Sequence, residues 1–191
     1  MQLNITGAQV DQETIITTAQ IKAHLRVTNS LEDDLIDSMR NASIAWIEQY
    51  CDIKIGSYTA EGFLPYFLSS YIPMGPVISI QSVKYQTTAS QANDDLTTLP
   101  AANWFYDLHT RPCRIAFQST PSTYDYAWLP VKVSMTIGHA VGSIPEPIIH
   151  AIRLLTASLY ENRQEEITAT THRLKMGLEA LLNPYRIIYQ P

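Results

Sequence analysis

The chain has 191 residues, 46% of them hydrophobic and 16% charged, with a formal net charge of −5. A chain of this kind can bury a core as a single domain, residues 1–191, without a disulfide framework or a metal. Lysine and arginine are nowhere concentrated among aromatic residues, which argues against a protein that grips nucleic acid through its phosphates. The two cysteines, Cys51 and Cys113, are far apart and fit a reducing compartment.

The N-terminal residues carry neither a basic start nor an apolar core, so we expect no signal peptide. Negative charge is concentrated in residues 1–52, which hold three bases against eight acids, whereas the other residues balance. Residues 62–83 are uncharged and long enough to span a bilayer, but three prolines would break the helix that a membrane requires. We therefore interpret 62–83 as buried strand and loop and expect no membrane partner.

The pattern of residues 17–52 predicts two helices. Thr17 or Thr18 can cap the first, which runs through AQIKAHLRV. The second begins near Ser30, which forms a capping-box-like pair with Asp33, and its first turn is acidic, as the helix dipole favours. Apolar residues then recur at steps of three and four, which predicts the buried face of a long helix. The members of this stripe are Leu31, Leu35, Met39, Ala42, Trp46 and Tyr50.

Residues 53–142 predict a β lobe, because apolar and polar residues begin to alternate there. Strands are expected at 76–85, 103–108, 111–118 and 130–139, and the short link HTR predicts a hairpin between the second and the third. In the last strand the alternation puts Val131, Val133, Met135 and Ile137 on one face. Two long polar stretches, QTTASQANDDLTTLPAA and STPSTYDYAW, predict exposed loops of a length typical of a partner-facing role.

Helical periodicity returns at residues 145–183, with Pro147 placed where a first turn tolerates it and a polar link, ENRQEEITATT, between two helices. Pro184 ends the last helix and opens a C-terminal tail, 184–191, that contains a strand-like apolar run. Such a tail either folds back onto its own core or serves a partner. Helices on both sides of a strand-rich centre indicate the α+β class.

We find no residue pattern that predicts a catalytic, cofactor-binding or metal site. The histidines lack metal-type spacing, there is no G-x-S-x-G elbow, and the glycines form neither a phosphate loop nor a dinucleotide fingerprint. We therefore expect a protein that is not an enzyme and has no cofactor. The eleven tyrosines, several of them in loop-like stretches, are typical of interaction surfaces or of cover for the sheet, and the sequence leaves both open.

The order of several motifs resembles that of the head–tail connector (adaptor, or head-completion) proteins of long-tailed bacteriophages. The resemblance rests on TTAQIKAHLRV, SLEDDLIDSMRNASIAWIEQYCD and PMGPVISIQSVKY, followed by WFYDL, VKVSMTIGHAVGSIPEPIIHAIRLLTASLYENRQE and LLNPYR. These run in the family's order from about residue 17 to 186. The loop after SVKY is longer than in the family, which leaves the conformation of that loop open.

The resemblance implies a structural virion protein at the head–tail junction, made in the cytoplasm of the host bacterium. Its fold would be a helical bundle, formed by residues 17–52 and 145–183, with an inserted antiparallel β lobe at 53–142. Family members form a homo-oligomeric ring, twelvefold, that docks under the portal protein, extends the DNA channel and contacts the next tail or stopper component. DNA would pass through without specific binding.

Two sets of residues are candidate sites within this interpretation. Acids that line the channel would repel DNA and let it slide, and we expect this role for Glu32, Asp33, Asp34 and Asp37. The tail is expected to extend from the body and dock on the portal or an adjacent subunit, by adding a strand to an exposed edge. Its binding residues would be Tyr185, Arg186, Ile187, Ile188 and Tyr189, although packing of the tail on its own core stays an alternative.

Other non-enzymatic phage particle proteins, such as a stopper or tail-joining component, share a strand-rich centre but do not need both flanking helical regions. A cytoplasmic enzyme or small-molecule-binding domain would require a deep pocket with convergent polar groups, which the scattered histidines and acids do not indicate.

Overall fold

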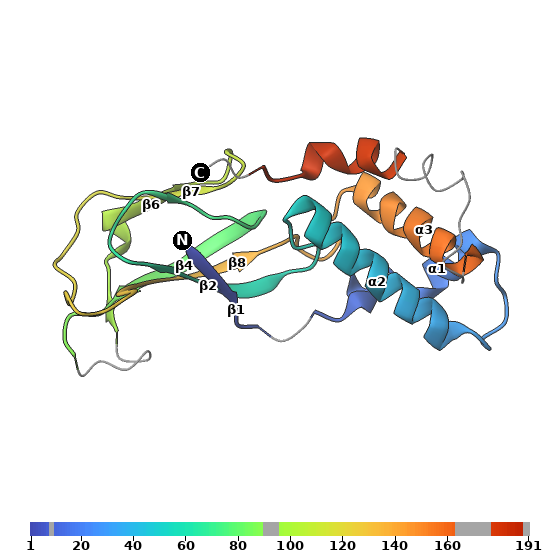
Figure 1. Ribbon diagram of the computed structural model, residues 1–191, viewed down its shortest axis with the longest axis horizontal. Coiled ribbons are helices and arrows are strands. Elements are labelled where there is room, and N and C mark those ends of the chain that lie inside the picture. Colours follow the sequence, from blue (N-terminus) through green and yellow to red (C-terminus); the bar gives the residue numbers. More distant parts are fainter. Residues whose placement is uncertain (8–9, 90–95, 163–176, 189–191) are drawn as a thin grey trace. The chain divides into compact units, whose positions relative to one another are not determined.

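The computed structural model describes residues 1–7, 10–89, 96–162 and 177–188, and it consists of two compact units (Figure 1). The sheet unit comprises residues 1–9, 57–139 and 187–191, and the helical unit comprises 10–56 and 140–186. The α+β class and the insertion of an antiparallel β lobe between helical regions are confirmed. Residues 1–7 and 187–188 belong to the sheet unit, and the single-domain expectation stays a prediction.

The sheet unit contains two antiparallel sheets. Five strands pair in the order β1-β2-β8-β4-β5 and three in the order β3-β7-β6. The strands of the larger sheet are β1 (Gln2–Ile5), β2 (Tyr58–Leu64), β8 (Val131–Ile137), β4 (Val77–Tyr85) and β5 (Thr97–Thr98). The smaller sheet consists of β3 (Ser70–Tyr71), β7 (Arg114–Phe117) and β6 (Trp104–Asp107). The β6–β7 pairing confirms the expected hairpin.

The central strand β8 shows why alternation predicts a sheet face. Val131, Val133, Met135 and Ile137 are all fully buried, as expected, whereas Lys132 between them pairs with Glu61 of β2 at 2.7 Å. Phe67, in the loop after β2, packs edge-on against Tyr85 of one sheet and Phe117 of the other. Phe67 thus contacts a strand of each sheet, and the buried side chains of β8 belong to the core of this unit.

The helical unit contains α1 (Thr18–Leu25), α2 (Asp33–Cys51) and α3 (Glu146–Glu161), with short 3₁₀ turns η1 (Gln12–Thr14) and η3 (Asn183–Tyr185). Residues 177–182 are also helical. Helices α2 and α3 lie side by side (Figure 1). Where they pack, the Thr156 hydroxyl donates to the Ser43 hydroxyl at 3.1 Å, and Ser43 donates to the Met39 carbonyl at 2.8 Å, with both side chains fully buried.

The predicted long helix is present as α2, but the prediction that the apolar stripe forms its buried face is wrong. The members of this stripe are exposed or half-buried, with Leu31 91%, Leu35 38% and Trp46 38% exposed. The buried face lies one residue along the helix and consists of Ile36, Arg40, Ser43, Ile44, Ile47, Glu48 and Cys51. Three of these residues are polar, and each is buried because it has a partner within the chain, so apolar periodicity alone could not find this face.

The start of α2 also differs from the prediction. The N-cap position is Glu32, no side chain caps the helix, and the expected Ser30–Asp33 capping box does not form. The acidic first turn is present, since Asp33 and Asp34 occupy it. At the other end, Glu48 accepts the backbone N–H of Ile55 at 2.9 Å and pairs with Lys54 at 2.6 Å, which fixes the chain as it leaves the helix.

Both cysteines are buried and free, as the sequence indicated. Burial raises the pKa of each thiol to about 11; the Asp52 charge also raises the Cys51 pKa and Arg186 lowers it, whereas Asp107 adds to the rise at Cys113. Thiols of this kind are inert at neutral pH. Within the described part of the chain, no helix is long and apolar enough to cross a bilayer, and residues 62–83 form strands and loops.

Candidate partner-binding site

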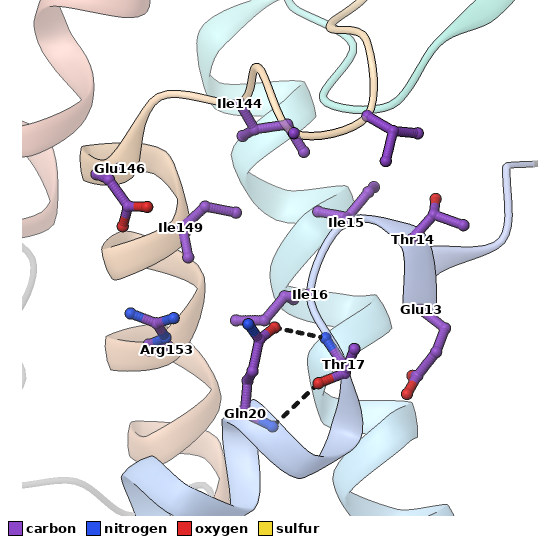
Figure 2. A pocket seen from close by; sticks show the side chains of 12 residues that line it. Glu13, Thr14, Ile15, Ile16, Thr17, Gln20, Ile144, Glu146, Ile149 and Arg153 are labelled. Atoms are coloured by element: carbon purple, nitrogen blue, oxygen red, sulfur yellow. Dashed lines mark hydrogen bonds between the residues drawn. The ribbon is translucent and has the colours of Figure 1, made fainter.

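A hollow of about 330 Å³ lies on the helical unit, and we call it the α1–α3 groove (Figure 2). Three segments line it: residues 13–17 with Gln20 of α1, residues 141–144, and the first half of α3. Figure 2 places Ile149 and Arg153 on α3, across from Ile16 and Gln20. A second hollow, of about 290 Å³, shares Gln20 and Arg153 with the first and continues past Ala23 and His24. The groove therefore follows the boundary between α1 and α3.

Local hydrogen bonds fix the N-terminal wall of this groove. Asp11 accepts the N–H of Glu13 at 3.0 Å and begins the η1 turn. Thr17 and Gln20 then form a capping box, in which each side chain accepts the backbone N–H of the other residue, at 3.2 and 3.0 Å (Figure 2). This confirms Thr17 as the cap of the first helix. The side-chain oxygens of Thr17 and Gln20 are therefore engaged by the backbone and shape this wall of the groove.

The charged group of that wall, Glu13, is also engaged. Its carboxylate accepts the backbone N–H of Thr18 at 3.0 Å and pairs with the guanidinium of Arg40, which is buried. Burial by itself would raise the pKa of Glu13, but the hydrogen bonds from Thr18 and the charge of Arg40 outweigh it and hold the pKa below the ordinary value of 4.5. Asp37 joins the same cluster, with its carboxylate 3.2 Å from Arg40.

Two charged side chains of the groove remain without such partners. Among the described residues, neither the half-buried guanidinium of Arg153 nor the carboxylate of Glu146 forms an ion pair or a side-chain hydrogen bond. Glu146 lies in the first turn of α3, where the helix dipole favours a carboxylate. Arg153 has no comparable compensation and lies between the two hollows. The groove thus offers isoleucine walls and one available cation.

This composition does not match a catalytic or metal site. Among the described residues, no three His, Cys, Asp or Glu side chains gather as metal ligands would. Glu13, Thr14, Thr17 and Gln20 of the lining are engaged in local hydrogen bonds or ion pairs, whereas a site for a small substrate needs several polar groups that converge on it.

Residues 15–99, which include part of the groove and the strands up to β5, match the model of a family described as "Phage gp6-like head-tail connector protein". This match confirms the resemblance to the head–tail connector family. It starts at Ile15 in the groove wall and takes in all of α1 and α2. No curated protein matches the chain.

Solved structures share the fold of this connector-like chain over its full length. One chain of "Neck of empty GTA particle computed with C6 symmetry" is 22% identical with a TM-score of 0.77. A chain of "Virion of native gene transfer agent (GTA) particle" is 21% identical with a TM-score of 0.77, and one of "Neck of native GTA particle computed with C12 symmetry" is 23% identical with 0.75. Each alignment covers 100% of this chain and 98% of the other.

The four acids that the connector hypothesis placed in a channel are not equivalent. The Lys22 ammonium lies 2.6 Å from the carboxylate of Asp33, and the Tyr160 hydroxyl donates to Glu32. Asp37 is engaged by Arg40, as described above. Only Asp34 is exposed and has no side-chain partner among the described residues.

The expectation that residues 185–187 extend from the body is wrong. Arg186 lies over the ring of Tyr50, 5.2 Å from its centroid, and Tyr185 is half-buried in η3. Ile187 is 6% exposed and lies so close to Gly75 that a Cβ on that glycine would be 3.0 Å from its Cδ1. Burial of an isoleucine and stacking of a cation on an aromatic ring both favour folding back. Ile188 is 67% exposed, and Tyr189 lies outside the described residues.

The isoleucines of the groove and Arg153 were missed by sequence reasoning. The pair Ile15–Ile16 directly before the cap Thr17 was the available signal, because a buried residue before an N-cap commonly packs against the fourth residue of its helix, here Ile21. No pattern marks Arg153, since its unpaired state depends on which groups the fold brings near it. The loop STPSTYDYAW is largely exposed, with Tyr126 and Trp128 almost fully so.

Proposed function

We propose that this protein is a subunit of the neck of a phage or phage-like particle, a non-enzymatic ring component that docks under the portal, extends the DNA channel and joins head to tail. The observation that carries the proposal is the connector-family match over residues 15–99 together with a fold shared from end to end with neck chains of a particle. Those particle necks were computed with sixfold and twelvefold symmetry, and we propose twelve copies per ring for this protein.

Reconstitution with the portal tests this proposal most directly. The purified chain, mixed with purified portal rings of the same particle, is expected to co-sediment with them, and native mass spectrometry should count twelve added copies. Portal rings from an unrelated particle are the control. Two results together would overturn the proposal: the chain binds no portal ring, and particles made without its gene still contain a complete neck.

We also propose that the acidic segment, Glu32, Asp33, Asp34 and Asp37, faces the channel. Like charge would keep DNA from adhering to the wall. The pairing of three of these acids within the chain leaves Asp34 with the largest free charge. Replacing Asp34 by Asn is expected to slow DNA ejection measurably at low salt, and an unchanged ejection rate would contradict this role.

The proposed docking of the tail now applies to Ile188 and the residues after it. Ile188 is exposed, whereas residues 185–187 contribute to the chain's own packing. Deletion of residues 188–191 is expected to reduce portal binding while thermal stability stays unchanged. Deletion of 185–191 would confuse the two effects, because it also removes the buried Ile187. Equal portal binding by the shorter deletion and the full chain would exclude docking by the tail.

A further inference from the structure

We propose that the α1–α3 groove of one subunit receives the turn formed by residues 31–35 of a second copy, with Asp34 of the turn pairing with Arg153 of the groove. The inference rests on the proposed ring function and names the surfaces through which neighbouring subunits meet. It takes the place of the channel role proposed above for Asp34, because a carboxylate paired with Arg153 of a neighbour does not face DNA. Both surfaces belong to the helical unit, and they are different from each other. Such a pairing is heterologous, which is the type of contact that closes a ring by rotation.

The turn carries two leucine side chains that are exposed to solvent. Leu31 is 91% exposed and Leu35, one helical turn later, is 38% exposed. Leu31 lies in the turn before the N-cap and Leu35 in the first turn of α2, so the entry to the helix carries two exposed leucines. Exposed leucines on a folded surface mark a contact site when they occur together.

The turn is also held in place by contacts of its flanking residues. Asn29 accepts the N–H of Leu31 at 3.1 Å, Lys22 holds Asp33 and Tyr160 holds Glu32. A loop fixed in this way loses little conformational freedom when a partner binds it. The only acid of this segment that these contacts leave available is Asp34, among the residues that the structure describes.

The groove offers the complementary features. Its apolar lining consists of the exposed Val141 and the half-buried Ile144 above the buried Ile15, Ile16 and Ile149. The side-chain oxygens of Thr17 and Gln20 are engaged in the capping box. Among the residues that the structure describes, Arg153 is the cation of the groove that has no partner. An apolar knob with a free carboxylate therefore meets an apolar hollow with a free guanidinium, and both halves are present in every copy of the chain. Complementary charge of this kind fixes the register of an interface.

A second copy is a better occupant than an unrelated peptide or a small ligand. The knob and the groove occur in the same chain with opposite unpaired charges, so each explains the exposure of the other. A small ligand would need several convergent polar groups, and among the described residues the charged side chains of the groove that have no partner are Arg153 and Glu146.

The test uses charge reversal with mixing. Asp34→Arg changes only the turn and Arg153→Glu changes only the groove, so in each variant alone two like charges meet at the contact. Each variant is therefore expected to need at least about tenfold more protein for half-assembly than the wild type. An equimolar mixture should recover assembly to within about threefold, because the new arginine of one variant meets the new glutamate of the other while the native pair forms at the alternate contact. Sedimentation velocity over a concentration series, with and without portal rings, measures these values for the full chain.

The matched control is Glu161→Arg, the same charge reversal on an exposed residue at the C-terminal end of α3. It is expected to assemble as the wild type does. Leu31→Ser should weaken assembly at unchanged melting temperature, since an exposed side chain contributes little to the fold.

The outcomes separate this inference from the function on which it rests. A wild type that assembles neither alone nor on the portal overturns the proposed function, and this interface with it. Variants that all assemble like the wild type, or a mixture no better than its components, overturn the interface and leave the ring function standing. If Arg153→Glu loses portal binding but still self-assembles, the groove binds the portal and not a second copy. If Asp34→Arg assembles like the wild type, Asp34 takes no part in the contact and the proposed channel role remains for it.

Discussion

The buried guanidinium of Arg40 connects three segments of the helical unit: Glu13 before α1, Thr18 at its first turn, and Asp37 on α2. Replacing Arg40 by Met keeps much of the packing but leaves two carboxylates near each other without their cation. Because both carboxylates are partly exposed and so partly screened, we expect a loss of about 2 kcal/mol in the free energy of unfolding. Urea denaturation measures it, and Arg26→Met at an exposed position should cost less than about 0.5 kcal/mol.

The depressed pKa of Glu13 makes the same cluster sensitive to acid. A carboxyl group whose pKa is lower in the folded state stabilises the fold above its ordinary value of 4.5, and this contribution is lost as the pH falls through the folded-state pKa. We expect the wild type to lose stability below pH 4.5 more steeply than Glu13→Gln. Thermal melts from pH 7 to pH 3 test this, and parallel curves for the two proteins would contradict the assignment.

At the scale of single elements, α2 shows how paired polar residues define a buried face. Ser43 faces α3 because its hydroxyl both donates to the helix backbone and accepts from Thr156. The buried face of α2 is therefore offset by one residue from the apolar stripe, because Ser43, Arg40 and Glu48 find their partners on that face. Apolar periodicity described an exposed face, and part of that face is the turn that we propose as a subunit contact.

The hydroxyl pair between α2 and α3 gives an asymmetric prediction. Ser43→Ala leaves the buried Thr156 hydroxyl without its acceptor and is expected to cost about 1–3 kcal/mol. Thr156→Val keeps the shape and leaves Ser43 bonded to Met39, so it should cost less than about 1 kcal/mol. Chemical denaturation of both variants checks the order, and a larger loss for Thr156→Val would show that Thr156 has another role.

For the whole molecule, the sheet unit draws its members from distant parts of the chain. Strand β1 pairs with β2 in an antiparallel register from Gln2 opposite Phe63 to Ile5 opposite Ala60. The N–H groups of Thr6 and Gly7 extend this contact to the Thr59 carbonyl, at 3.0 and 3.2 Å. The N-terminal segment therefore covers what would otherwise be an open edge of the larger sheet.

Removal of this segment is expected to expose β2 as a sheet edge. A chain without residues 2–7 should melt at a lower temperature and aggregate at concentrations at which the full chain does not, because unpaired strand edges associate. Differential scanning calorimetry and light scattering measure both effects. Asn4→Ala, which changes one exposed side chain and no backbone bond, is the control and should behave as the full chain does. Unchanged melting and solubility of the shortened chain would show that β1 contributes little.

The sequence by itself determined the α+β class, the order of helices and strands, the hairpin, the buried face of β8 and the connector resemblance. These depend on local periodicity and on motif order, which are properties of the chain before it folds. Only the tertiary structure decided which face of α2 is buried, where residues 185–187 pack and which charges of the groove remain free. Each of these depends on partners distant in sequence, as Ser43 on Thr156, Ile187 on Gly75 and Glu13 on Arg40, and such pairings leave no local pattern.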